Sequence, residues 1–322
     1  IANCRVSGNI QVDGGNAVIA GLVGYNENGI IKDCYSGVHM TAAANAIFSG
    51  IVGFNSGTVE ACANTGNLTG SLTEGMSFVS GIVLQNIGGT VQGCYNTGSL
   101  TGGDYSYIGG LLGMNAGTVQ NCYNTGKLTA GEEAQIGGIV GSNSGSIQNT
   151  YFLQDTVDGA PVNAGLYGIA EEDDGEPSNN GAEPQTAAYM RSGEFIDVLN
   201  SGKPVFCVDL PGYDALNNGY PILKWQAGIT LTYVNGAVII STSEALENAV
   251  LVAAAYEENQ KLVFANVTRD IFVAAGETYP VFLDQQSADG VLNSGGSMKV
   301  FLWEDLSTQK PLVKPLEITG GQ

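Results

Sequence analysis

Apolar and polar positions recur along the first half of the chain with one long period. A glycine-rich apolar core is followed each time by a second apolar position, a cysteine position and a third apolar position. The cores start roughly 28 to 31 residues apart, a period that indicates stacked repeats. They read GLVGYN, GIVGFN, GIVLQN, GLLGMN and GIVGSN, at Gly21–Asn26, Gly50–Asn55, Gly81–Asn86, Gly110–Asn115 and Gly138–Asn143.

Each copy contains three short apolar runs that favour strands. In the fourth copy they are Ile108–Met114, Thr118–Gln120 and Cys122–Thr129. Each run is too short for a helix and is bounded by Asn, Gly or Ser. We therefore predict an all-β fold in which residues 1–153 form a parallel β-helix (β-solenoid) with three strands per coil, its coils pairing at about 4.8 Å. A leucine-rich repeat has a similar period, but the glycine content and the lack of a helical segment within a copy argue against it.

Side chains keep one register in every copy. Counted from the cysteine position, the residue three before is apolar, the residue two before is polar, and the residue six after is apolar. A stacked strand with one buried face needs such a constant register. Three interior ladders are predicted: cysteines, leucines and, at one corner, asparagines bonding to the coils above and below. Their members are Cys34, Cys62, Cys94 and Cys122; Leu68, Leu100 and Leu128; and Asn26, Asn55, Asn86, Asn115 and Asn143.

The stacked cysteines are predicted to be buried free thiols. Neighbours about 4.8 Å apart lie within disulfide range, but their side chains point in parallel and not at one another. A buried free cysteine behaves as a small hydrophobe. No paired spacing such as C-x-x-C occurs, so we predict no metal and no cofactor.

The cores and the trailing GTVQNCYNTG at Gly117–Gly126 resemble the GLUG repeat of bacterial secreted and surface proteins. The resemblance covers roughly residues 1–152. The GLUG family includes parts of immunoglobulin A peptidases and large adhesins. The resemblance implies an extracellular location and a spacer or adhesive role, and it brings no catalytic residues.

Residues 154–225 are predicted to cap the solenoid, whose end would otherwise expose an apolar face and unpaired strand edges. The acidic run Glu171–Glu176 suggests a surface loop. Thr186 is the expected N-cap of an amphipathic helix, Ala187–Leu199. The apolar residues that we expect to pack on the last coil are Tyr220, Ile222, Leu223 and Trp225.

From residue 226 to residue 322 the pattern changes to short strands separated by turns. Seven or eight of them predict an immunoglobulin-like (Ig-like) β-sandwich. Residues 245–318 also resemble a non-catalytic module found beside enzymes and repeats in exported bacterial proteins. The expected strands are Ile229–Val234, Ala237–Ser241, Ala249–Tyr256, Lys261–Asn266, Asp270–Ala275, Tyr279–Asp284, Met298–Trp303 and Leu312–Ile318.

Charge and hydropathy narrow the classes of partner. Eleven basic against 31 acidic residues give a net charge of −20, which excludes the basic face that nucleic-acid binding needs. No apolar run approaches 18 residues, so no membrane insertion is expected. Ile1 stands in the middle of a repeat, and we interpret the chain as part of a longer exported protein, extracellular or at the cell surface, whose signal peptide lies outside this sequence.

A tyrosine follows most cysteine positions and is the strongest candidate for ligand binding. Alternation along a strand places these tyrosines outward if the cysteines face inward. An outward aromatic column could bind sugar rings, or it could stabilise the solenoid by cross-strand stacking. The column consists of Tyr35, Tyr95, Tyr123 and Tyr151.

Catalytic chemistry is not expected. The chain has one histidine, His39, so zinc-binding H-E-x-x-H motifs are absent. The repeat does not align the paired carboxylates that glycoside hydrolysis requires. We predict a non-enzymatic adhesive or spacer scaffold whose partners are glycans or host or cell-surface proteins. Two alternatives remain, a carbohydrate-binding module that uses the tyrosine column, and an accessory region of a larger secreted peptidase or glycosidase.

Overall fold

The computed structural model describes the chain except residues 14–17, 43–46, 71–75, 158–159, 164, 210–215, 228, 235, 243–245, 275–277, 284, 305, 307–311, 313–315 and 320–322. It divides into two compact units, Ile1–Leu223 and Lys224–Gln322. Residues 154–223 therefore belong to the same unit as the repeats.

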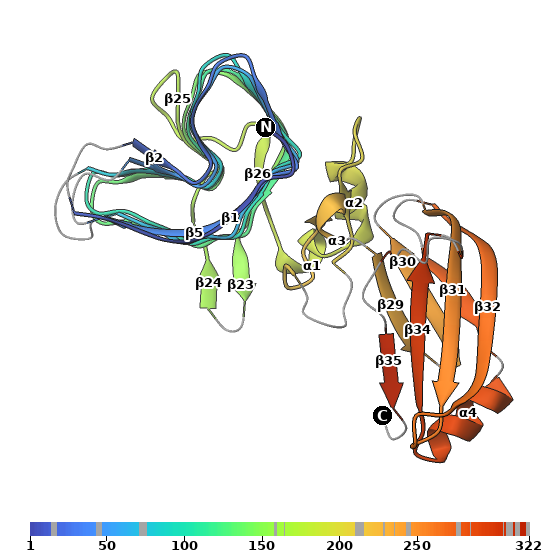
Figure 1. The fold of residues 1–322 in the computed structure, drawn as a ribbon. Coiled ribbons are helices and arrows are strands. Elements are labelled where there is room, and N and C mark those ends of the chain that lie inside the picture. The colour runs from blue at the N-terminus through green and yellow to red at the C-terminus, as the bar shows by residue number, and fades with distance from the viewer. Residues whose placement is uncertain are drawn as a thin grey trace. The chain divides into compact units, whose positions relative to one another are not determined.

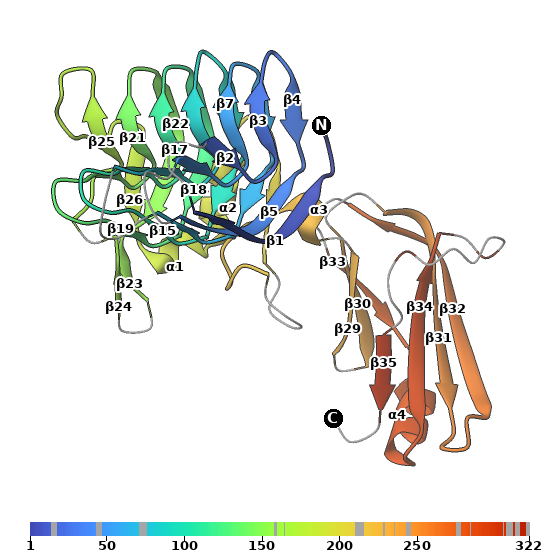
Figure 2. The ribbon, with the colours of Figure 1, turned by 60° about the vertical axis from the view of Figure 1, so that its left-hand side comes forward.

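The first unit is a β-solenoid of about five turns, and this confirms the predicted all-β solenoid fold. Figure 1 shows its coils superimposed along the axis, and Figure 2 shows them following one another. Two of its three parallel sheets hold one strand per coil. One contains β2 (Val18–Ala20), β6 (Ile47–Ser49), β11 (Phe78–Ser80), β16 (Tyr107–Gly109) and β20 (Gln135–Gly137). The other contains β3 (Val23–Asn26), β7 (Val52–Asn55), β12 (Val83–Asn86), β17 (Leu112–Asn115), β21 (Val140–Asn143) and β25 (Ile169–Glu172).

The third sheet has 13 strands and carries the cysteine and leucine positions. Its strands pair in parallel with the same residue type opposite, for example Leu68 with Leu100 and Leu100 with Leu128. They are β1 (Arg5–Val12), β4 (Ile30–Lys32), β5 (Tyr35–Ala42), β8 (Thr58–Glu60), β9 (Ala63–Asn64), β10 (Leu68–Thr69), β13 (Thr90–Gln92), β14 (Tyr95–Asn96), β15 (Leu100–Thr101), β18 (Thr118–Asn124), β19 (Leu128–Thr129), β22 (Ser146–Leu153) and β26 (Ala182–Gln185).

Each coil thus visits three sheets, but its strands differ from the three predicted runs. The first predicted run of the fourth copy breaks into β16 and β17, which lie in different sheets. The second and third runs join in β18 as far as Asn124. Glycine makes the break sharp, because a Cβ at Gly81 would overlap the carbonyl oxygen of Gly110 on the next coil.

Two apolar clusters fill the solenoid. The cysteines pack in the first with the valines and isoleucines that precede them, and all of the cysteines are free thiols. Cys62, Cys94 and Cys122 are fully buried. The leucine ladder lies in the second cluster, with Met40, Phe48 and Ile108.

Of the described part of residues 154–223, only the part that carries β25 and β26 covers the end of the solenoid, where Ile169 and Ala182 join its apolar core. Strands β25 and β26 pair in parallel with β21 and β22, so they extend the solenoid by part of a further coil. The predicted loop at the acidic run is correspondingly wrong for Glu171 and Glu172, which belong to β25. A hairpin of β23 (Asp155–Val157) and β24 (Ala160–Val162) precedes β25.

Residues 186–209 and 216–223 pack on the side of the solenoid, not on its end; we call them the lateral segment. The predicted single helix is two short ones, α1 (Ala187–Met190) and α2 (Gly193–Leu199), because Ser192 caps a second start after Thr186 has capped the first. Strands β27 (Phe206–Cys207) and β28 (Ile222–Leu223) then pair with each other. In Figure 1, α1 and α2 lie beside the coils.

The second unit contains two small antiparallel sheets around one apolar core. The expected strands over residues 261–275 are one long strand, β32, and a helix, α4, was not expected. The Ig-like assignment stays a prediction. The elements are α3 (Lys224–Ala227), β29 (Ile229–Val234), β30 (Ala237–Thr242), β31 (Leu246–Tyr256), β32 (Leu262–Val273), β33 (Thr278–Phe282), α4 (Gln285–Asn293), β34 (Ser297–Trp303) and β35 (Leu316–Thr319). In the described part of the chain, no helix is long and apolar enough to cross a membrane.

Candidate functional site: an amide-lined pocket beside the solenoid

A polar column runs along the outside of the solenoid two residues before the cysteine ladder. Its members pair in register on β4, β8, β13, β18 and β22, and they face outward because the apolar residue before each one faces the core. Gln92 Nε2 donates to Glu60 Oε2 at 2.8 Å, and Gln120 Nε2 donates to Gln92 Oε1 at 2.9 Å. The column consists of Lys32, Glu60, Gln92, Gln120 and Gln148.

The corner beside this column requires a left-handed backbone. Gly93, Asn121 and Asn149 have φ values of 60°, 53° and 45°, a region that glycine and asparagine tolerate best. Asn149 Nδ2 donates to Asn121 Oδ1 at 3.3 Å, and Asn121 Nδ2 donates to the carbonyl oxygen of Ser201 at 2.8 Å. The corner therefore presents carboxamides and holds the lateral segment at one point.

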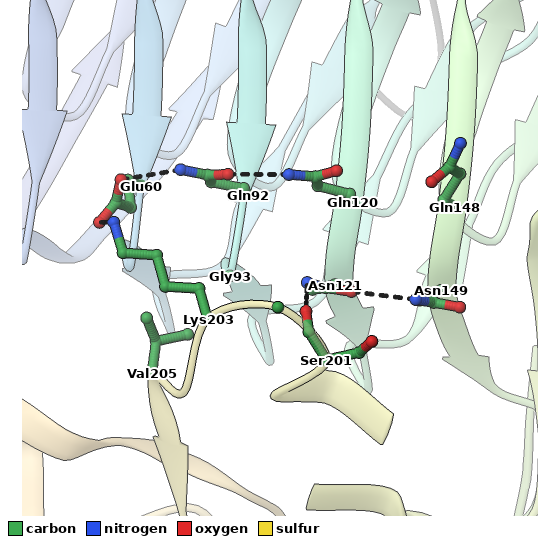
Figure 3. A pocket seen from close by; sticks show the side chains of 11 residues that line it. Glu60, Gln92, Gly93, Gln120, Asn121, Gln148, Asn149, Ser201, Lys203 and Val205 are labelled. Carbon is green, nitrogen blue, oxygen red and sulfur yellow. Dashed lines mark hydrogen bonds and ion pairs between the residues drawn. The ribbon is translucent and has the colours of Figure 1, made fainter. Parts of the chain in front are cut away.

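Residues 201–205 of the lateral segment pass over the polar column and over the corner beside it. Together they line a pocket of about 420 Å³. Lys203 reaches back and pairs with Glu60. Val205 packs on Gly93, where a Cβ would overlap its side chain. Figure 3 shows the glutamines in a row on neighbouring strands, with Lys203 opposite them. The lining residues are Glu60, Gln92, Gly93, Gln120, Asn121, Gln148, Asn149, Ser201, Gly202, Lys203 and Val205.

The pocket is polar and close to neutral. Burial acts to raise the pKa of Glu60, but hydrogen bonds from Lys203 and Gln92 outweigh it and hold that pKa below its ordinary value. Glu60 thus stays charged and Lys203 compensates it. Five carboxamides, the two asparagines and three glutamines, make up most of the remaining polar lining.

The tyrosines form the column that the register predicts, but they are not an exposed platform. Tyr123 pairs in register with Tyr95 and Tyr151, and the rings of Tyr95 and Tyr123 stack with their centroids 5.1 Å apart. Tyr95 and Tyr123 are fully buried and Tyr151 is nearly so, so the column presents no open aromatic face, and its stacked rings fit the alternative of cross-strand stacking. Tyr35 is half-buried, and its hydroxyl lies 2.7 Å from Thr65 Oγ1.

The lateral segment is what covers these rings. Phe195 contacts the ring of Tyr123 edge-on, and the ring centroid of Phe206 lies 5.7 Å from that of Tyr123. The Tyr123 hydroxyl donates to the carbonyl oxygen of Pro221 and accepts from Asn217 Nδ2. Burial raises the pKa of Tyr123 well above its ordinary value, so the phenol stays neutral. The column is therefore an internal docking surface.

Tyr220, Ile222 and Leu223 are buried in this same lateral packing, not against the last coil as predicted. The guanidinium of Arg191 lies over the ring of Tyr220 at 4.4 Å from its centroid. Trp225, which we grouped with them, falls in the second unit.

The asparagine ladder runs unbroken from coil to coil. Each amide donates to the next asparagine at 2.7 to 2.9 Å, from Asn26 to Asn143, and Asn143 Nδ2 donates to Glu172 Oε2 at 2.9 Å. Glu172 occupies the asparagine register on β25, and its carboxylate, an acceptor only, ends the ladder.

A second asparagine ladder was missed by sequence reasoning. Asn64 Nδ2 donates to Asn96 Oδ1, and Asn96 Nδ2 to Asn124 Oδ1, all three being fully buried. The signal was present as an asparagine two residues after three of the cysteines, with Ser36 before them and Phe152 after them.

The cysteine and histidine side chains have structural partners. The Cys62 and Cys94 thiols donate to the carbonyl oxygens of Glu60 and Gln92, and burial raises both thiol pKa values well above the ordinary value. His39 Nδ1 accepts from the backbone N–H of Asn67 at 3.1 Å. Among the described residues, no group of three or more His, Cys, Asp or Glu is arranged to hold a metal.

Comparison with known families identifies the GLUG motif at residues 104–129. That stretch holds β16 to β19, most of the fourth coil. The comparison with curated proteins gave no match. The chain therefore carries a GLUG repeat, and its copies build a β-solenoid.

Proposed function

We propose that this chain is a non-catalytic part of an exported protein and that its solenoid serves as a stiff spacer, outside the cell or at its surface. The observation that carries the proposal is the unbroken asparagine ladder, which ties every coil to the next through hydrogen bonds. Because each coil makes the same bonds, length is gained by adding copies.

Burial supports the same role. Each fully buried leucine of the ladder contributes about 1.5 to 3 kcal/mol, and the buried cysteines add smaller apolar contacts in successive coils. The rigidity of a spacer depends on such contacts between neighbours. The GLUG motif supports the extracellular location through the family resemblance.

A non-catalytic role is supported by the partners of the reactive groups. The Cys62 and Cys94 thiols have raised pKa values and pack in the core, and the Glu60 carboxylate is paired with Lys203. These groups act in holding coils and lateral segment together.

Surface labelling tests the location. Antibodies raised against the purified chain should label intact producing cells or detect the protein in the culture medium. Labelling only after the cells are opened would contradict the proposal.

Insertion of a coil tests the spacer mechanism. Duplication of residues 110–137 should leave the protein folded and move the ends of the solenoid apart by about 4.8 Å. Spin labels on non-natural residues at Tyr25 and Glu171, in the first and last strands of one sheet, would measure the distance. As a control, an equal number of Gly and Ser residues inserted after Glu132, in an exposed turn, should leave the distance unchanged. An unfolded duplication variant would refute extension by repetition.

A further inference from the structure

We propose that the amide-lined pocket binds a neutral saccharide that lies along the solenoid axis. The pocket lies between the polar column and residues 201–205, and it is distinct from the covered tyrosine column. Its volume of about 420 Å³ is within the range of small-molecule sites, roughly 300 to 1,000 Å³. The proposal adds a binding activity to the spacer and does not depend on that role.

The carboxamides of the pocket keep hydrogen-bonding capacity for a ligand. Each has two N–H donors and an oxygen with two lone pairs. Gln92 donates one N–H to Glu60 and accepts one N–H from Gln120. Gln120 therefore has also used one of its two N–H groups. Within the described part of the chain, the second N–H and a lone pair remain on each. A carboxamide can donate to one hydroxyl of a sugar ring and accept from the adjacent one, so a row of them suits a polyol.

Charge points to a neutral ligand. Lys203 compensates the single carboxylate of the lining, Glu60, so the pocket offers no unpaired cation to an acidic sugar. The chain as a whole carries a net charge of −20 and repels polyanions over longer distances. Uronic acid polymers should therefore bind more weakly than neutral glycans of the same length.

Side-chain chemistry favours a saccharide over an extended peptide. A bound peptide strand gains affinity from backbone pairing at a sheet edge and specificity from pockets for alternate side chains. The polar column lies on the face of its sheet, where the backbone is already paired. Val205 is the one aliphatic side chain in the lining, so the pocket holds no separate apolar subsites for alternate peptide side chains.

The row is longer than one sugar ring. Gln92, Gln120 and Gln148 lie on three successive coils, and two coil spacings amount to about 10 Å. An oligosaccharide contacting two or three of these amides should bind more tightly than its monosaccharide.

Calorimetric titration of the full chain tests the proposal. The probes are neutral tetrasaccharides of glucose, mannose and N-acetylglucosamine, the matching monosaccharides, and tetragalacturonic acid. At least one neutral tetrasaccharide should bind with a Kd of about 1 mM or lower, and more tightly than its monosaccharide and than tetragalacturonic acid. Gln120→Ala and Gln148→Ala should each weaken this binding about tenfold, the effect of one lost hydrogen bond.

Gln85→Ala is the matched control. Gln85 is an outward glutamine of the same solenoid, on β12 in another sheet, and its loss should leave the Kd unchanged. Native protection of the buried thiols shows that each variant is folded. The proposal is overturned if no neutral tetrasaccharide binds, if tetragalacturonic acid binds more tightly than every neutral probe, or if folded Gln120→Ala and Gln148→Ala bind as the parent does. None of these results bears on surface labelling or on coil insertion.

Discussion

Asparagines in two columns link the coils through their side chains as well as through the backbone. Asn86 is fully buried; its amide donates to Gly89 and Asn115, and its oxygen accepts from Asn55. Its removal leaves several polar groups without partners where water cannot reach them. A buried donor or acceptor left unpaired costs more than the net gain from one hydrogen bond, so these columns should dominate the response to mutation.

We therefore expect Asn86→Ala to lower the free energy of unfolding by about 1 to 3 kcal/mol for each group left unpaired. Gln85→Ala, the neighbouring outward position, should stay within about 0.5 kcal/mol of the parent. All six cysteines lie in the first unit, so exposure of their thiols in urea measures its unfolding. Equal losses in the two variants would mean that the ladder contributes nothing of its own.

The ion pair between Glu60 and Lys203 makes part of the stability depend on pH. The pKa of Glu60 is lower in the folded protein than its ordinary value of 4.5. Its contribution is therefore complete above that ordinary value and is lost as the pH falls through the folded pKa. The contribution should stay below about 1 kcal/mol, since the Lys203 side chain is 56% exposed and solvent screens the pair.

Thermal melts of the parent and Glu60→Gln would measure this effect. The parent should melt at the higher temperature at pH 7, and the difference should shrink as the pH falls below 4.5 and through the folded pKa of Glu60. Asp33→Asn supplies a control, because Asp33 also lies within 3.6 Å of a lysine, Lys32, and has no contact with the lateral segment in the described structure. A difference that does not shrink at all below pH 4.5 would show that the carboxylate charge is not its cause.

Among the elements, the short strands that carry the leucine ladder depend most on burial. Strand β15 has two residues, and Leu100 is fully buried between Leu68 and Leu128. Leu100→Ala should cost about 2 to 5 kcal/mol, from lost transfer free energy and the cavity left behind. Thr101→Ala, on the same strand but half-buried, should cost far less. Thiol exposure in urea measures both, and a cost under about 1 kcal/mol for Leu100→Ala would contradict an interior position.

The lateral segment should detach from the solenoid more often when its contacts with Tyr123 are removed. Tyr123 stacks on Tyr95, contacts Phe195 and Phe206, and bonds to the segment through its hydroxyl. Tyr123→Ala should therefore speed tryptic cleavage after Arg191, which Ser192 follows in the lateral segment, by at least about tenfold, equivalent to about 1.4 kcal/mol of local stability. Tyr123→Phe, which keeps the ring, should have a smaller effect.

Tyr107 offers the control for that experiment. It is also an outward tyrosine in a stacked pair, with its ring centroid 5.2 Å from that of Phe78, but it lies in a different sheet. Tyr107→Ala should leave cleavage after Arg191 unchanged. Equal acceleration in both alanine variants would indicate general loosening of the solenoid, not release of the segment.

These elements show what the sequence could and could not predict. The ladders of Cys94, Leu100 and Asn86 were predictable because a fixed period places equivalent residues on top of one another. The burial of Tyr123 was not, since the residues that cover it, such as Phe206 and Asn217, lie more than 80 residues further along the chain and outside the repeat. Alternation tells which face of the strand a side chain takes, but not what covers that face.

The amide-lined pocket was out of reach for the same reason. Its glutamine column was visible as a constant polar position, whereas Glu60 and Lys203 are 143 residues apart in sequence. The further coil from β25 and β26 was hidden because neither strand carries the glycine core of the repeat, and Glu172 replaces the expected asparagine.

At the scale of the whole molecule, the two units should unfold as separate cooperative transitions, because each has its own apolar core. The chain provides a separate probe for each unit. Both tryptophans, Trp225 and Trp303, lie in the second unit, and all six cysteines lie in the first. Tryptophan fluorescence in urea should therefore report one midpoint and thiol exposure another.

Leu100→Ala tests whether the two units unfold independently. Its cost falls on the solenoid, so it should lower the midpoint from thiol exposure and leave the midpoint from fluorescence unchanged. Val300→Ala, which removes fully buried volume from the second core, should do the reverse. If either substitution moved both midpoints together, the units would be one cooperative system, and the solenoid could not gain or lose coils without disturbing the module that follows it.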